Sequence, residues 1–231
     1  MNWITDHKIP LGEWMEAFVD WLVGNASGFF DAIASSLEWL ILGMTGVLQF
    51  FPPLAFTAMV AAIAWWLHRS WGLVIFSVVA LLVIANLGYW VEMIETLVLV
   101  LMATFLSIVI GIPSGIVAAH HPRFHAGIRP IMDLMQTIPT FVYLIPTLIL
   151  FGLGVVPGLI STIIFAIAAP IRLTALGISS VPEELLEAGK AFGASKRNLL
   201  LKVELPAAMP SIMAGVTQCI MLSLSMVVIA A

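Results

Sequence analysis

The sequence has unusually few charged residues for its length. Of 231 residues, 10% are charged and 61% are hydrophobic, whereas about a quarter of the residues in a soluble domain are charged. A chain this short could not hide so much apolar surface in a core, because it must also cover itself with water-facing side chains. The composition therefore excludes a water-soluble domain and predicts an all-α, polytopic helical membrane protein.

Other absences exclude several functions. The single cysteine, Cys219, allows no intrachain disulfide framework. A net charge of −4 provides no basic field for binding nucleic acid. No G-x-x-x-x-G-K-[ST] loop occurs, so the chain lacks that means of binding ATP phosphates. His120, His121 and His125 lie in a predicted solvated turn with no adjacent acidic or cysteine ligand, which argues against a metal site. The sequence also shows no nucleophile–base arrangement of the kind that would indicate an enzyme.

Gaps between charged residues predict where the chain crosses the membrane. Each gap reaches the roughly 20 residues that a helix needs to cross a bilayer, and the gaps are residues 70–91, 96–122, 134–171 and 205–231. The third gap is too long for one crossing, so its internal turn signals predict two helices, near 131–151 and 157–178. A shorter span at 53–67 completes an accessory transmembrane region, residues 52–91. Gly111 and Gly115 predict close packing between helices.

The distribution of basic residues predicts the orientation. If the spans alternate, seven of the nine Lys and Arg residues lie on one side, which the positive-inside rule assigns to the cytoplasm. These seven are Arg69, Arg123, Arg129, Lys190, Lys196, Arg197 and Lys202. The N-terminus is then expected outside the cell.

Residues 1–51 differ in pattern from the predicted spans. An apolar stripe recurs at steps of three and four: Phe30, Ile33, Leu37, Leu40, Met44, Val47 and Phe51. Polar residues follow the opposite stripe: Asp31, Ser35, Glu38, Thr45 and Gln49. This pattern is typical of an amphipathic helix on a membrane surface or against other helices, although a span near 39–51 remains an alternative. We expect an extracytoplasmic scaffold that braces the spans from residue 53 onward.

The polar segment 179–204, between two predicted spans, is the most informative part of the sequence. Ser180, three residues before Glu183, predicts a capping box, with Pro182 in the first helical turn. The predicted helix is too short and too charged to cross a membrane. Small residues make a notch that would let another protein approach closely: Ala188, Gly189 and Gly193.

The spacing in this segment follows a known motif. The motif is EAA-x3-G-x9-I-x-L-P. It is matched by Glu187-Ala188-Gly189, then Gly193 after three residues, then Val203-Glu204-Leu205-Pro206 after nine more. Two positions differ conservatively, Gly189 for alanine and Val203 for isoleucine. From about Glu95 to its end, the chain therefore resembles the membrane subunits of binding-protein-dependent ABC importers. In that family the segment, which here includes Phe192, is the coupling helix that docks into a groove on the ATPase subunit.

The resemblance implies a type I ABC importer permease fold over residues 92–231. Such permeases have five core helices and work as dimers in the cytoplasmic membrane of bacteria, with separate ATPase subunits and an external binding protein. Four core helices are visible here, and the fifth is expected beyond Ala231. ATP and Mg²⁺ are expected on the ATPase, with no cofactor on this chain.

Residues 134–143, LMQTIPTFVY, look like permeases for glycine betaine, proline betaine, carnitine and choline. The resemblance thus implies import of a quaternary-ammonium solute. A permease for another small solute such as an amino acid, or an ion-coupled transporter, remains an alternative.

Polar residues in the predicted helix 131–151 are candidates for lining the pore. They are Gln136, Thr137, Pro139 and Tyr143. Polar side chains in a span are costly against lipid, so they are expected to face the bundle interior or a water-filled path. Hydrogen bonds that merely hold the helices together are an equally good explanation.

Overall fold

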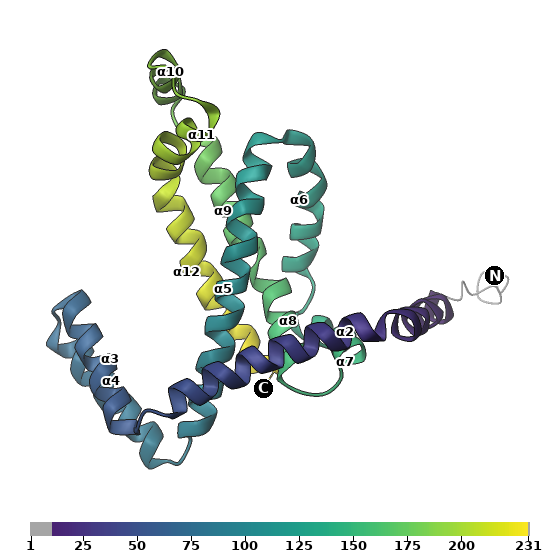
Figure 1. Ribbon diagram of the computed structural model, residues 1–231, viewed down its shortest axis with the longest axis vertical. Coiled ribbons are helices and arrows are strands. Elements are labelled where there is room, and N and C mark those ends of the chain that lie inside the picture. Colours follow the sequence, from purple (N-terminus) through teal and green to yellow (C-terminus); the bar gives the residue numbers. More distant parts are fainter. Residues whose placement is uncertain (1–10, 231) are drawn as a thin grey trace, which may run out of the picture.

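The computed structural model describes residues 11–230, and this part of the chain consists of helices joined by short turns, without strands (Figure 1). The first ten residues of the predicted extension lie outside the described residues, as does Ala231. The main helices are α2 (Leu11–Gln49), α3 (Pro53–His68), α4 (Trp71–Asn86), α5 (Trp90–His120), α6 (Pro122–Thr137), α7 (Leu144–Phe151), α8 (Val155–Ala166), α9 (Ala168–Ser179), α10 (Glu183–Ala191), α11 (Lys196–Leu199) and α12 (Leu205–Ala230).

Three helical rods form the centre of the molecule. They comprise Trp90–His120, Val155–Ser179 and Lys196–Ala230, and each is long and apolar enough to cross a membrane. In Figure 1, α5, α9 and α12 run side by side, and α9 packs against both of the others. The predicted spans at 96–122, 157–178 and 205–231 are therefore confirmed as long apolar helices.

Glycines let α9 approach its two neighbours closely. A Cβ atom on Gly111 of α5 would lie 2.7 Å from Cγ of Pro170, and one on Gly115 would lie 2.6 Å from Cβ of Thr174. On the other side, a Cβ atom on Gly177 would lie 2.7 Å from a side-chain atom of α12. Since real Cβ atoms do not approach so closely, only glycine fits these positions. The predicted close packing at residues 111 and 115 is confirmed.

The predicted single helix at 131–151 is wrong. α6 ends at Thr137, a 3₁₀ turn follows at Thr140–Tyr143, and the chain on either side of the break differs in direction by 112°. Ile138 precedes a proline, which disfavours helical backbone, and it has an extended conformation with ψ of 134°. The segment is therefore a broken span or a re-entrant loop.

Helices α3 and α4 form a hairpin at the side of the molecule (Figure 1). Each has 16 residues, which is fewer than the roughly 20 that a helix needs to cross a bilayer. The hairpin packs against α5 through Phe56, whose ring centroid lies 5.5 Å from that of Trp90. Val60 and Leu81 also pack against the buried cluster that includes Phe56. Many apolar side chains of the hairpin are nevertheless exposed, including Trp66 and Phe76. The structure thus gives two short apolar helices in the predicted accessory region.

Helix α2 is a single helix of 39 residues. It runs obliquely across α5 in the half of the molecule opposite α10 (Figure 1), and it also contacts α7 and α8. By length and composition it could also cross a membrane, so both alternatives given for this segment remain.

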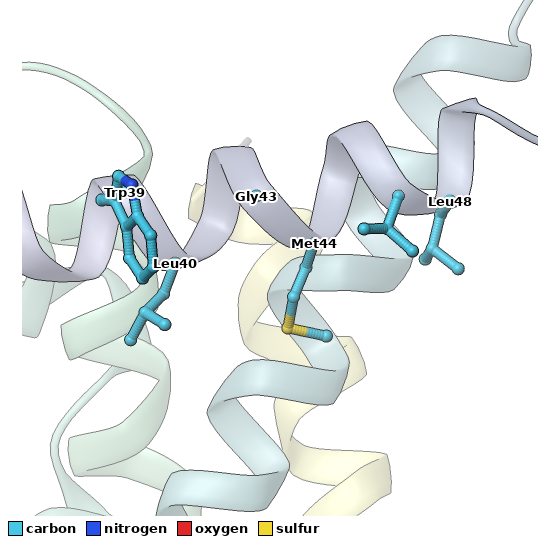
Figure 2. Close-up of a pocket in the computed structure, with 6 residues that line it drawn as sticks. Trp39, Leu40, Gly43, Met44 and Leu48 are labelled. Carbon is cyan, nitrogen blue, oxygen red and sulfur yellow. The ribbon is translucent and has the colours of Figure 1, made fainter.

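The face of α2 that contacts the core includes only part of the predicted apolar stripe. Leu37 and Met44 pack against the α5 cluster, but Leu40 and Val47 are 41% and 64% exposed. Thr45, assigned to the polar stripe, is buried. That assignment was wrong because the buried face is rotated toward Ile41 and Thr45. Leu40 and Val47, with neighbouring residues, line an apolar groove of about 380 Å³ (Figure 2), made by Trp39, Leu40, Gly43, Met44, Val47 and Leu48.

Candidate coupling segment and membrane path

Residues 179–204 form a projection at one end of the molecule (Figure 1). It contains α10, α11 and η2 (Leu200–Glu204), a wider π-helical turn that leads directly into α12. α10 has nine residues, which is a length of about 13 Å. The predicted short helix that does not cross the membrane is therefore confirmed.

The capping box predicted for the start of α10 is wrong. The Ser180 hydroxyl donates a hydrogen bond to the backbone carbonyl of Leu176 at 2.7 Å, and Pro182 precedes α10 without any side-chain cap. Ser180 follows the last residue of α9, where its short side chain reaches the carbonyl four residues earlier more easily than an amide in the next helix.

The two motif glycines have different surroundings. A Cβ atom on Gly189 would lie 2.7 Å from Cδ1 of Leu199, so Gly189 packs against α11 of its own chain. The predicted notch is therefore wrong at this position, because the chain itself fills the space. Gly193 has a φ of +75°, and a Cβ atom added there would meet nothing within 4 Å. Its amide donates to the Lys190 carbonyl at 2.9 Å, which ends α10 in the left-handed conformation that favours glycine.

The outer surface of α10 combines carboxylates with apolar side chains. Glu187 and Ala188 are exposed, and Phe192 is 93% exposed. Glu183 and Glu184 add negative charge at the start of the helix. Aromatic residues are enriched in protein interfaces, so this surface is suited to docking against another protein.

The end of the motif attaches the projection to the membrane helices. Val203 lies next to Gly189, with its Cγ2 atom 3.5 Å from where a Cβ would stand. Leu205 packs against a cluster that includes Ile178 of α9 and Ile116 of α5. Pro206 is exposed at the start of α12, and it lacks the N–H that would continue regular helical bonding into η2. The projection is thus anchored on two membrane helices.

A partly buried contact between His120 and Glu204 adds a second attachment. The Glu204 carboxylate, on a buried residue, lies 2.9 Å from Nε2 of His120, the last residue of α5. Nδ1 of His120 lies 2.9 Å from the carbonyl of Ile116. These contacts join the end of α5 to the turn that leads into α12.

His120 is exposed, as expected, but it is the last residue of α5 and its contact with Glu204 was not predicted. Its partner Glu204 is 84 residues away in the sequence, and only the packing of α5 against η2 brings them together. No local pattern could have identified this contact. Beside it, a cavity of about 580 Å³ is lined by basic residues that include Lys190, Lys196 and Arg197.

Three of the four pore candidates shape the break between α6 and α7. The Thr137 and Tyr143 hydroxyls both donate to the carbonyl of Leu134, at 3.2 and 3.3 Å. This carbonyl lies in the last turn of α6. Pro139 occupies the break itself, immediately before the 3₁₀ turn. For Thr137 and Tyr143 the structure therefore shows hydrogen bonds that stabilise the local backbone.

The fourth candidate, Gln136, lies beside two charged residues. Nη1 of Arg172 donates to Oε1 of Gln136 at 2.8 Å, and Nη2 donates to Oδ1 of Asp133 at 2.7 Å. Arg172 and Asp133 line a cavity of about 360 Å³ at the junction of α6 and α9. The sequence contained one signal for this cluster, because these two residues bound the charge-free gap 134–171.

Known proteins resemble this chain over most of its length. Residues 111–231 match the family described as binding-protein-dependent transport system inner membrane component. The glycine betaine transport system permease protein OpuAB of Bacillus subtilis is 46% identical over 97% of this chain and 79% of that protein. The glycine betaine/proline betaine permease protein ProW of Escherichia coli is 46% identical over 97% of this chain and 64% of that protein. The glycine betaine/carnitine permease protein GbuB of Listeria monocytogenes is 43% identical over 96% of this chain and 79% of that protein.

These similarities cover the coupling segment and all the central helices. They confirm the resemblance drawn from the motif and the predicted type I ABC permease fold. They also confirm that the chain is a transport subunit rather than an enzyme. The family depends on separate ATPase and substrate-binding proteins. Together with the long apolar helices, the match to residues 111–231 shows that this multi-pass membrane protein belongs to the inner membrane components of binding-protein-dependent transport systems.

Proposed function

We propose that the chain is the pore subunit of an ATP-driven importer of quaternary-ammonium solutes of the glycine betaine type. The observation that carries this proposal is the identity of 43–46%, over nearly the whole chain, to permeases named for glycine betaine. Identity at this level extends through the membrane helices as well as the coupling motif, which supports a shared class of solute.

In the proposed cycle, α10 is the docking element for a separate ATPase subunit, which binds ATP and Mg²⁺. Closure of two ATPases on ATP pushes the coupling segments and turns the pore from inward-facing to outward-facing. A binding protein outside the cell then releases the solute into the pore. The His120–Glu204 contact and the packing of Leu205 support this role, because they join the docking helix to α5 and α9.

The pore is formed by two copies of the chain, surrounded by lipid. The half-exposed charges of Asp133 and Arg172 support a dimer, since charged groups inside a membrane face other protein or water rather than lipid. The N-terminus lies outside the cell, with α2 as a scaffold. In support of this orientation, the α3–α4 and α5–α6 turns point the same way as the basic coupling segment (Figure 1).

Charge reversal on α10 tests the coupling role. In vesicles that contain the complete transporter, Glu187→Arg is expected to lower ATP-driven glycine betaine uptake about tenfold or more while ATP hydrolysis continues. Gly193→Trp is expected to act similarly, because it fills the open end of α10. Glu38→Arg on the exposed face of α2 is the matched control and keeps normal uptake.

Two outcomes would contradict the proposal at different points. Normal uptake by both α10 variants would remove the coupling role from this segment. Uptake by the unaltered chain that needs an ion gradient and no ATPase would instead support an ion-coupled transporter.

The orientation has its own test. A cysteine at Ser35, which is exposed on α2, is expected to react with a membrane-impermeant thiol reagent added outside intact cells. The background is Cys219→Ala, so that no other thiol is present. Labelling only after the inner face is made accessible would place α2 on the cytoplasmic side.

A further inference from the structure

Asp133 and Arg172 are charged residues on segments that otherwise have the character of membrane helices. Arg172 lies on the rod Val155–Ser179, which is long and apolar enough to cross a membrane, and Asp133 lies on α6, part of the broken span or re-entrant loop. Arg172 is seven residues before the end of α9 and Asp133 eleven residues after the start of α6, so neither is at a helix end. Charged residues within membrane helices are rare and mark pathways or binding sites more often than structural features.

The cluster lies on the side of α9 that this chain leaves open. Elsewhere α9 is closed, because Pro170 and Thr174 pack against α5 and Gly177 packs against α12. Arg172 instead faces α6, with 42% of its side chain exposed, and Asp133 is 55% exposed. The cavity beside them, of about 360 Å³, is within the range of about 300–1,000 Å³ for small-ligand sites. Its remaining walls are His125, Arg129, Met132, Ala175, Leu176 and Ser179.

The ion pair has unused binding capacity. The guanidinium group of Arg172 has five N–H donors, and its hydrogen bonds within residues 11–230 go only to Gln136 and Asp133. In the same part of the chain, Asp133 accepts a hydrogen bond through Oδ1 and none through Oδ2. A planar guanidinium group suits a carboxylate, which it binds with two parallel hydrogen bonds. The free carboxylate oxygen of Asp133 suits a positive group.

We propose that Asp133 and Arg172, with Gln136, bind a small zwitterionic solute on its way through the pore. The solute carboxylate takes N–H groups of Arg172, and its ammonium group lies against Asp133. A quaternary ammonium group has no N–H, so its attraction to Asp133 is purely coulombic. This inference rests on the proposed function and assigns the solute class within its pore.

The pair is expected to favour a solute without net charge. Arg172 and Asp133 neutralise each other when the site is empty. A zwitterion takes up the spare N–H groups of Arg172 and the free oxygen of Asp133 together and leaves the net charge unchanged. A bare cation such as choline lacks the carboxylate, so the spare N–H groups of Arg172 stay without a partner and the site gains a positive charge beside Arg129.

Neutralising the pair tests the site. The complete transporter, with its ATPase and binding protein, is placed in vesicles, and ATP-driven uptake of glycine betaine is measured for Arg172→Gln, Asp133→Asn and the double variant. The amides of the double variant can still hydrogen-bond with each other, so a clasp that only holds α6 against α9 is largely restored. A solute site is not restored. We expect maximal uptake to fall about tenfold or more in all three, with binding-protein-stimulated ATP hydrolysis retained.

A cysteine at Ser179, in the wall of the cavity, gives a second readout in a Cys219→Ala background. High concentrations of glycine betaine are expected to slow its reaction with a water-soluble thiol reagent, and not to do so in the double variant. Recovery of uptake in the double variant, or equal slowing in both backgrounds, would overturn the site. Failure of the unaltered transporter to take up glycine betaine would instead overturn the proposed function.

Discussion

The N-terminal hairpin is at least as apolar as the central helices, yet the two regions pack very differently. In α9, eight of the twelve residues are buried, whereas α4 has 16 residues and none is buried. The difference follows the small residues, because glycines on α5, α9 and α12 let those backbones approach closely. Between helices in lipid there is little hydrophobic driving force, so close packing at small residues provides the stability. Hydropathy thus identifies membrane helices, but small residues identify the ones that form a rigid unit.

In the proposed cycle, this contrast also separates the parts by function. The tightly packed α5, α9 and α12 carry the coupling segment at one end, so a push on that segment would move them together. The α3–α4 hairpin has few contacts with this unit, so it can follow the motion without transmitting it.

The largest expected effect tests the tight region. In Gly115→Ala, the new Cβ atom would lie 2.6 Å from Cβ of Thr174 and 2.7 Å from the backbone carbonyl oxygen of Ile171. Backbone cannot move aside as a flexible side chain can, so α5 and α9 must separate. We expect a loss of about 3 kcal/mol in the free energy of unfolding, measured as a lower melting temperature in detergent.

The matched control is Gly28→Ala in α2, where a Cβ atom would meet nothing within 4 Å. Alanine favours a helix relative to glycine, so the stability is expected to be unchanged or higher by up to about 1 kcal/mol. Equal destabilisation by the two variants would remove the distinction between the two regions.

A smaller effect is expected at the connection between the rigid unit and the coupling segment. Glu204→Ala removes the contact with His120, whose side chain is 41% exposed and can be hydrated instead, so the cost is about 1 kcal/mol. Faster hydrogen exchange of the backbone amides in residues 183–204 would report this loosening. Glu204→Gln is expected to restore protection, since its amide can donate to Nε2 of a neutral His120. Glu184→Ala, on the exposed surface of α10, is the control that leaves exchange unchanged.

The smallest effect is expected in the hairpin. Trp66 is 78% exposed, so Trp66→Ala should change the free energy of unfolding in detergent by less than about 0.5 kcal/mol. A loss comparable to that of Gly115→Ala would mean that the hairpin belongs to the rigid unit and would contradict the contrast drawn above.

The features that the sequence predicted correctly depend on local properties. Absence of charge over more than 20 residues predicted α5 and α12, and turn signals within the long gap predicted the α8–α9 rod. The charge-free gap 70–91 contains only the 16-residue α4 and the first residues of α5. The coupling segment was predicted because its polar composition interrupts that pattern at a motif spacing. The break at Ile138 was also visible locally, since proline restricts the residue before it. The hydropathy of residues 134–151 favoured a continuous helix and gave the wrong prediction.

The missed features depend on contacts between distant residues. Arg172 and Asp133 are 39 residues apart, and His120 and Glu204 are 84 apart. Periodicity within one helix cannot indicate which face meets another helix when both faces are apolar. The same reason explains α2, where Thr45 is buried and Val47 is exposed although the spacing alone assigned them the opposite way.

The wide turn η2 limits how the length of such a sequence can change during evolution. A π-helical turn holds one residue more than an α-helical turn, and η2 lies between the coupling segment and α12. Adding or removing a residue within 200–203 would displace everything before it, including α10, by up to about 1.5 Å relative to α12. Glu204 joins α12 directly and would keep its place beside His120, but α10 would meet its partner in a different position. We therefore expect inherited insertions and deletions to accumulate in exposed turns such as 152–154, while the number of residues in this turn stays constant.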